Sequence, residues 1–92
     1  MLDLYFKGGQ KMLEVKKTTY LVEGCNEPCW EVSNGYTMVR ISKLYRLIGR
    51  PSILLTEFLG GEWNGNEEFD GNFDELDGFF AERMAKQYSV YL

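Results

Sequence analysis

The chain has 92 residues, of which 45% are hydrophobic and 15% aromatic. This length supports one domain with one modest core, so we expect a single α+β domain over residues 1–92. Residues 1–11 precede an internal methionine and are a candidate dispensable N-terminal arm. No apolar run approaches about 18 residues, which argues against a transmembrane helix, and the first residues lack a signal-peptide pattern. We therefore expect a cytoplasmic protein with no membrane partner.

Two features of the composition narrow the function. The chain has no histidine, so the commonest general base and metal ligand is missing, and we expect a non-enzymatic protein without a cofactor. Residues 1–50 hold eight Lys/Arg and five Asp/Glu, whereas residues 51–92 hold two Lys/Arg and nine Asp/Glu. This uneven charge argues against direct nucleic-acid binding and favours a basic partner.

The first half of the chain reads as β-structure. Residues 2–6 and 12–22 are expected strands, and in the second of them Leu13 and Val15 alternate with charged residues. A loop follows over residues 24–28. The clearest signal is a hairpin over residues 30–41, because Asn34 and Gly35 accept the positive φ angles of a type I′ turn.

The second half predicts two helices. Ser42 is placed to cap a short helix over residues 43–48, which Gly49 would end. Residues 53–59 fit a strand or a short buried helix, and the glycine-rich residues 60–71 predict a loop. Asn72 and Glu75 resemble a capping box, and a final helix over 73–88 would have one apolar face, formed by Phe73, Leu76, Phe80, Met84 and Tyr88.

The expected architecture is therefore α+β. It is a small antiparallel sheet with a central hairpin, a short helix, and a C-terminal amphipathic helix packed on the sheet. Cys25 and Cys29 flank the loop before the hairpin. A zinc site would need further ligands, and no histidine supplies them. We expect free thiols near a turn, with a disulfide as the alternative.

Residues 62–82 form an acidic segment without a basic residue. It contains Glu62, Glu67, Glu68, Asp70, Asp74, Glu75, Asp77 and Glu82. One interpretation is a solvated loop that leads into a helix whose first turns favour carboxylates. A second is a degenerate EF-hand calcium loop, with Asn66, Glu68, Asp70 and Asp77 as ligands and a glycine for the sharp turn at 71.

A third interpretation is an interaction surface for a basic groove, because a dense row of carboxylates can replace a phosphate backbone. Trp63 lies among the acids where no core periodicity includes it, and aromatic residues often anchor interfaces. Phe79 lies off the apolar face of the predicted helix, among charged residues. The predicted partner-binding residues are Glu62, Trp63, Glu67, Glu68, Asp70, Asp74, Glu75 and Phe79.

The basic half offers a second candidate surface. Lys16 and Lys17 are adjacent, and Lys43, Arg46 and Arg50 have helical spacing that would place a basic stripe beside Tyr45, with Arg40 shortly before them. Such a stripe can contact nucleic acid. The alternative is a solvated helix face opposite Leu44, Leu47 and Ile48.

The stretch Glu62-Trp-Asn-Gly-Asn-Glu-Glu-Phe-Asp70 resembles the acidic loop-to-helix segment of small anti-CRISPR proteins that inhibit a Cas nuclease. The resemblance covers about a fifth of the chain. It implies a phage- or plasmid-encoded inhibitor that occupies a nucleic-acid channel of a host defence protein, with Glu67, Glu68 and Asp70 as the matching acids. We therefore expect an anti-CRISPR or anti-restriction type of inhibitor that acts as a DNA mimic. The alternatives are a calcium-binding module and a structural or regulatory adaptor.

Overall fold

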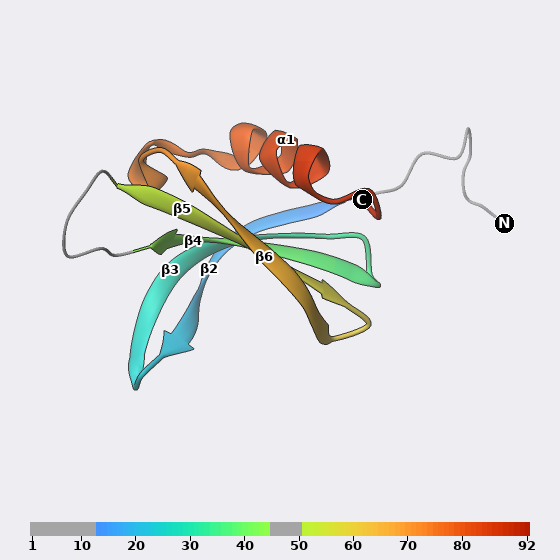
Figure 1. The fold of residues 1–92 in the computed structure, drawn as a ribbon, viewed down its shortest axis with the longest axis horizontal. Helices are drawn as coiled ribbons and strands as arrows, with labels where there is room; N and C mark the ends of the chain where they lie inside the picture. The colour runs from blue at the N-terminus through green and yellow to red at the C-terminus, as the bar shows by residue number, and fades with distance from the viewer. Residues whose placement is uncertain (1–12, 45–50) are drawn as a thin grey trace, which may run out of the picture.

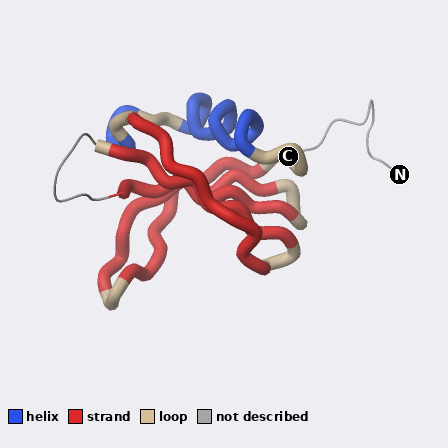
Figure 2. Tube along the Cα trace, viewed as in Figure 1, coloured by secondary structure: helices blue, strands red, loops and turns tan. Residues whose placement is uncertain are grey.

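The computed structural model describes residues 13–44 and 51–92, which form one antiparallel sheet with a single α-helix across one face (Figure 1, Figure 2). The five strands lie in the sheet in chain order, so the sheet is a meander. They are β2 (Glu14–Val22), β3 (Cys25–Ser33), β4 (Thr37–Leu44), β5 (Ser52–Leu59) and β6 (Glu62–Asp70). A 3₁₀ helix, η2 (Phe73–Glu75), and helix α1 (Gly78–Tyr88) follow.

The core lies between the sheet and α1. Cross-strand partners share a face of a sheet because side chains alternate along each strand. The pairs Val32–Val39 and Ile41–Leu55 point to the side on which α1 buries two alanines, whose small side chains let the helix backbone approach the sheet. We call this side the helix face and the opposite side the open face. The buried core consists of Val32, Val39, Ile41, Ile53, Leu55, Phe73, Ala81 and Ala85.

The predicted α+β class is wrong, because the described part of the chain is mostly β. Strands account for 58% of it and helices for 19%. Residues 53–59, which fitted either a strand or a helix, belong to β5, which lies between β4 and β6 in the sheet. The apolar run there is long because β5 has neighbours on both sides and buries residues on both faces.

The largest error concerns residues 60–71, which we expected to be a loop. Instead, residues 62–70 form β6, which pairs with β5. Gly60 and Gly61 have φ angles of 59° and 87° and connect the pair Leu59–Glu62. Two successive positive φ angles are what a two-residue hairpin turn requires, so two of the four glycines mark a hairpin turn inside the predicted loop.

The helical segments are also shorter than expected. Asn72 caps η2, since its side chain accepts a hydrogen bond from the backbone N–H of Asp74. Leu76 is extended and ends that turn, and Asp77 then caps α1 by accepting from the N–H of Phe80. The expected helix over 73–88 therefore divides at Leu76. Of the expected helix over 43–48, the first two residues end β4 and the others lie outside the described residues.

The predicted hairpin over 30–41 is confirmed, because Trp30 pairs with Ile41 and Val32 with Val39. Its connection differs from a type I′ turn. The last cross-strand pair is Ser33–Met38, three residues separate β3 from β4, and of these only Gly35 has a positive φ. Asn34 contributes through its side chain, whose Oδ1 accepts from the N–H groups of Tyr36 and Thr37.

Two further expectations concern the ends of the chain and membranes. The proposed arm over 1–11 and the strand over 2–6 lie outside the described residues. Within residues 13–44 and 51–92, no helix is long and apolar enough to cross a membrane.

Candidate partner-binding surface

Six of the nine acidic residues in the second half of the chain lie on β6, at one edge of the described sheet, and on η2. Among the described strands, β6 has β5 as its single neighbour, and η2 continues from it. The acids on these two elements are all exposed, and we call them the acidic edge: Glu62, Glu67, Glu68, Asp70, Asp74 and Glu75. Trp63 and Phe79, the two aromatic residues predicted to contact a partner, are also exposed.

Strand geometry divides the acids of β6 between the two faces. Glu67 pairs with Leu55 and therefore lies on the helix face, whereas Glu68 pairs with Leu54 on the open face. Asp70, two residues further on, shares the open face with Glu68. Because β6 is an edge strand of the described sheet, the acids on both of its faces are exposed.

A β-bulge turns Trp63 to the open face. Glu57 pairs with Gly65 and Phe58 pairs with Trp63, which leaves Asn64 as an extra residue on β6. Regular alternation counted back from Glu68 would have placed Trp63 on the helix face, and the extra residue reverses this. The indole therefore shares the open face with Glu68 and Asp70, and its side chain is 65% exposed.

A buried carboxylate fixes this bulge. Glu57 lies on the helix face and is buried. Its Oε1 accepts from Nδ2 of Asn64 at 2.8 Å, and its Oε2 accepts a hydrogen bond from Oγ of Ser89, directly after α1. The same carboxylate therefore joins the bulge to the end of the helix. Burial raises the pKa of Tyr88, and the negative charges of Glu57 and Glu67 raise it further.

Phe79 is not brought to the β6 part of the acidic edge. It is 63% exposed, but it belongs to the first turn of α1. The adjacent Gly78 lies close to Val15 of β2 and Trp30 of β3, toward the other end of the sheet. The Phe79 ring contacts Phe80 edge-on at 5.4 Å, and the guanidinium of Arg83 lies 5.7 Å from its centroid.

One of the two acids of η2, Asp74, forms an ion pair. Oδ2 of Asp74 lies 3.2 Å from Nζ of Lys43 on β4. The Asp74 side chain is 66% exposed, so solvent screens the pair and its contribution to stability is small. Lys43, a member of the predicted basic stripe, therefore lies on β4 beside an acid, whereas Arg46 and Arg50 lie outside the described residues.

The calcium-loop interpretation is wrong. Its proposed ligands Glu68 and Asp70 belong to an extended strand, and Asp77 is used as the cap of α1. An EF-hand loop instead wraps its ligands around one point. Within the described ranges, no group of three or more His, Cys, Asp or Glu side chains is arranged to hold a metal ion.

The two thiols are free, as the first of the two interpretations expected. Both lie on β3, where four residues of strand span about 13 Å, well beyond the distance that a disulfide bridges. Cys25 is exposed and Cys29 is buried. Burial raises the pKa of Cys29, the nearby Glu31 raises it further, and Arg40 opposes these effects.

Arg40 occupies the open face in a way that the sequence did not indicate. Its guanidinium lies 4.5 Å from the ring centroid of Tyr20 and 5.0 Å from that of Phe58, so it is held between side chains of β2 and β5. Its Nε is buried without a hydrogen-bond partner in the described structure. The aromatic contacts identify Arg40 as a connection across the sheet, because guanidinium groups stack favourably on aromatic rings.

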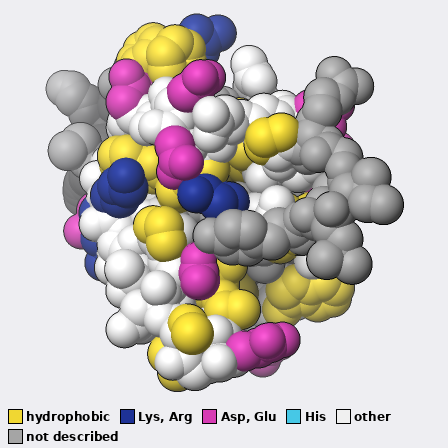
Figure 3. Space-filling view, turned by 90° about the vertical axis from the view of Figure 1, so that its left-hand side faces the viewer, with side chains coloured by type: hydrophobic (Ala, Val, Ile, Leu, Met, Phe, Trp, Pro, Cys, Tyr) yellow, Lys and Arg dark blue, Asp and Glu magenta, His cyan; other side chains and the backbone are white. Residues whose placement is uncertain are grey.

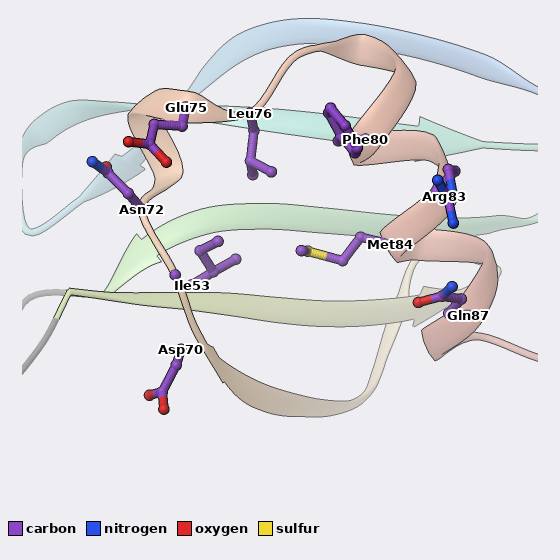
Figure 4. Close-up of a pocket in the computed structure, with 10 residues that line it drawn as sticks. Ile53, Asp70, Asn72, Glu75, Leu76, Phe80, Arg83, Met84 and Gln87 are labelled. Carbon is purple, nitrogen blue, oxygen red and sulfur yellow. The ribbon is translucent and has the colours of Figure 1, made fainter.

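A groove next to the acidic edge was also missed. It has a volume of about 440 Å³ and lies between α1 and the segment that joins β6 to η2 (Figure 4). Its apolar lining comes from Ile53, Leu76, Phe80 and Met84, and the acids Asp70 and Glu75 lie at its border. The groove lies where the predicted helix is divided at Leu76. The sequence predicted one continuous helix over 73–88 and therefore gave no sign of a groove there.

The rest of the surface is mixed in charge where it is seen. On the face drawn in Figure 3, Lys and Arg side chains lie among Asp and Glu side chains. Comparisons with protein-family models, curated protein sequences and solved structures gave no match for this chain.

Proposed function

We propose that this protein is a non-catalytic inhibitor that binds a basic, nucleic-acid-handling protein through the acidic edge. The target class we propose is a bacterial defence protein of the kind that anti-CRISPR and anti-restriction proteins inhibit. The carboxylates would occupy Lys and Arg sites that otherwise hold phosphates, so the protein would act as a mimic of nucleic acid.

One observation carries this proposal, namely the exposure of Trp63 on the same face of β6 as Glu68 and Asp70. Charged side chains on an end strand are also explained by protection against aggregation. That explanation does not require an exposed tryptophan, which in water adds a large apolar surface. Aromatic side chains beside charges are typical anchors of interfaces.

The rigidity of the acidic edge supports the proposal. Alternate residues of a strand are about 6.6 Å apart, so pairing with β5 holds Glu68 and Asp70 at this spacing on the open face. The hydrogen bonds of Glu57 to Asn64 and Ser89 fix the bulge that orients Trp63. Such a surface loses little conformational entropy on binding. Its negative field would also accelerate encounter with a basic groove.

The test compares two charge-matched variants in a pull-down from a bacterial lysate, eluted with a salt gradient. The first variant combines Glu67→Gln, Glu68→Gln and Asp70→Asn, which removes three charges from the acidic edge. The control combines Glu14→Gln, Glu23→Gln and Glu82→Gln, which removes three charges from β2, the β2–β3 turn and α1. We expect the parent and the control to retain a basic protein that elutes at moderate salt, and the first variant to lose it.

The captured protein is then titrated with labelled duplex DNA in the presence of each variant. Mimicry predicts that the parent and the control displace the DNA and that the first variant does not. Trp63→Ala should weaken binding by about 2 kcal/mol, the effect of losing an interface anchor, whereas Leu21→Ala, at an equally exposed position of β2, should have no effect. A first variant that folds and still binds as tightly as the parent would show that these carboxylates are only solvated.

A further inference from the structure

We infer that the groove between α1 and the β6–η2 segment is a docking site for one apolar side chain of the partner, presented next to lysine or arginine residues. This inference rests on the proposed function, because the groove borders the acidic edge. It adds an apolar contact that charge mimicry alone does not supply.

The groove is apolar at its base, and polar and charged residues complete its lining. Figure 4 shows the side chains of Ile53, Leu76 and Met84 converging on the floor, with Phe80 beside them on α1. The carboxylate of Asp70 points away from the floor. An apolar group that enters the groove therefore meets no carboxylate at the base.

The backbone makes room for this groove. Gly71 has a φ of 155°, and a Cβ at this position would lie 3.0 Å from Cδ1 of Ile53. The chain therefore passes closely over Ile53, which is 2% exposed, and forms one wall. The volume of about 440 Å³ lies in the range of sites that hold small ligands, which is ample for a leucine or phenylalanine side chain. The flexible side chain of Met84 can adapt to its shape.

The exposure of Phe80 indicates that this wall is incomplete in the isolated protein. Phe80 was expected on the buried face of the final helix, yet it is 51% exposed. The lining includes Glu75 and Arg83, whose charges are opposite, and Asp70, whose carboxylate points away from the floor. Asp70 and Glu75 also belong to the acidic edge, so the groove adjoins that negatively charged surface. Charge complementarity therefore favours a partner segment in which the apolar side chain has basic neighbours.

The test uses two synthetic heptapeptides with six lysines around a central residue, which is leucine in one and serine in the other. Affinities are measured by fluorescence anisotropy for the parent protein and for two matched variants, Phe80→Ala and Phe79→Ala. Both variants truncate an exposed phenylalanine of the same helical turn, but only Phe80 lines the groove. We expect the leucine peptide to bind the parent about tenfold more tightly than the serine peptide. Phe80→Ala should reduce this ratio to about one, and Phe79→Ala should preserve it.

The outcomes separate this inference from the proposed function. If both peptides bind the parent equally and the Glu67→Gln, Glu68→Gln, Asp70→Asn variant loses both, the groove is not an apolar docking site and charge binding stands. If neither peptide binds the parent, the docking site is refuted, and the pull-down with the charge variants decides the proposed function separately. If the protein dimerises and Phe80→Ala abolishes the dimer, a second copy occupies the groove and the peptide assignment is overturned. As a check independent of the variants, the leucine peptide should shift the amide NMR signals of residues 76–87 more than the serine peptide does.

Discussion

The clearest test of the structure itself concerns the buried carboxylate of Glu57. This side chain accepts hydrogen bonds from Asn64 in the bulge and from Ser89 after α1. We expect a double-mutant cycle with Glu57→Ala and Ser89→Ala to give a coupling energy of about 1.5–3 kcal/mol, the usual net contribution of a hydrogen bond to a charged group. Ser89→Ala alone should cost a similar amount, because it leaves a buried carboxylate with one fewer donor.

Glu57→Gln separates the charge from the shape of the side chain. The amide oxygen can still accept from Asn64, and the amide NH₂ can donate to Oγ of Ser89. Two neutral hydrogen bonds would then replace two charged ones, so we expect a loss of about 1 kcal/mol. Glu57→Ala should cost more, because it leaves the donors of Asn64 and Ser89 without their acceptor.

The measurement is urea unfolding of the parent, the two single alanine variants and their combination, with thermal unfolding as a second readout. For a domain of this size, a loss of 2 kcal/mol corresponds to a fall in Tm of about 8–16 °C. A coupling energy below about 0.5 kcal/mol would refute the reasoning, since residues that do not interact have additive effects within that range. It would mean that Glu57 does not join the bulge to the end of α1.

Four further predictions follow from single sites. Gly35→Val should destabilise the protein by about 1–3 kcal/mol, because Gly35 has a φ of 100° although a side chain there would meet no atom; an unchanged Tm would show that the loop tolerates the strain. Ellman's reagent should titrate one thiol in the native protein and two in denaturant, because Cys25 is exposed whereas Cys29 is buried and has a raised pKa; rapid reaction of both would contradict the burial. The pKa of Tyr88 is raised in the folded state, so the unfolded state loses the phenolic proton at a lower pH, and stability should fall as the pH rises above the ordinary tyrosine value of 10.0. The fall should be less steep in Tyr88→Phe. Urea midpoints measured across this pH range for the parent and the variant give the two slopes of stability against pH, and equal slopes would exclude Tyr88 as the cause. Arg40→Lys should cost about 1–2 kcal/mol in thermal unfolding, because an ammonium group does not stack between two rings as a guanidinium does; Lys16→Gln, on the neighbouring exposed surface, is the control that should have little effect.

The sequence by itself determined the features that depend on neighbouring residues. The hairpin over 30–41 follows from alternating apolar residues around Asn34 and Gly35, and the structure pairs Val32 with Val39 as this pattern predicts. The exposure of Trp63 was also indicated locally, because no apolar periodicity includes it. Local chemistry placed the acids correctly at the surface, since a carboxylate is costly to bury unless it has hydrogen-bond donors.

Only the tertiary structure decided whether residues 60–71 form a loop or a strand. The segment is polar and rich in glycine, so its own preferences favour a loop. It becomes β6 because β5 offers a row of backbone hydrogen-bonding groups beside it, and the two-glycine turn brings it back in register. Strand formation here depends more on pairing with β5 than on the side chains of the segment. Residue preferences alone therefore underestimate the tendency of this segment to form a strand.

The sequence also did not predict which side chains of β6 share a face of the sheet. One extra residue, Asn64, reverses the alternation and turns Trp63 toward the side of Glu68 and Asp70. The donors that hold this bulge in place converge on Glu57 from β6 and from the residue after α1, which are far apart in the chain. The sequence therefore determined that an acidic, tryptophan-containing segment is exposed. The long-range pairing with β5 and the buried carboxylate decided which of its side chains share a face, because a bulge is stable only where the folded chain satisfies its hydrogen bonds.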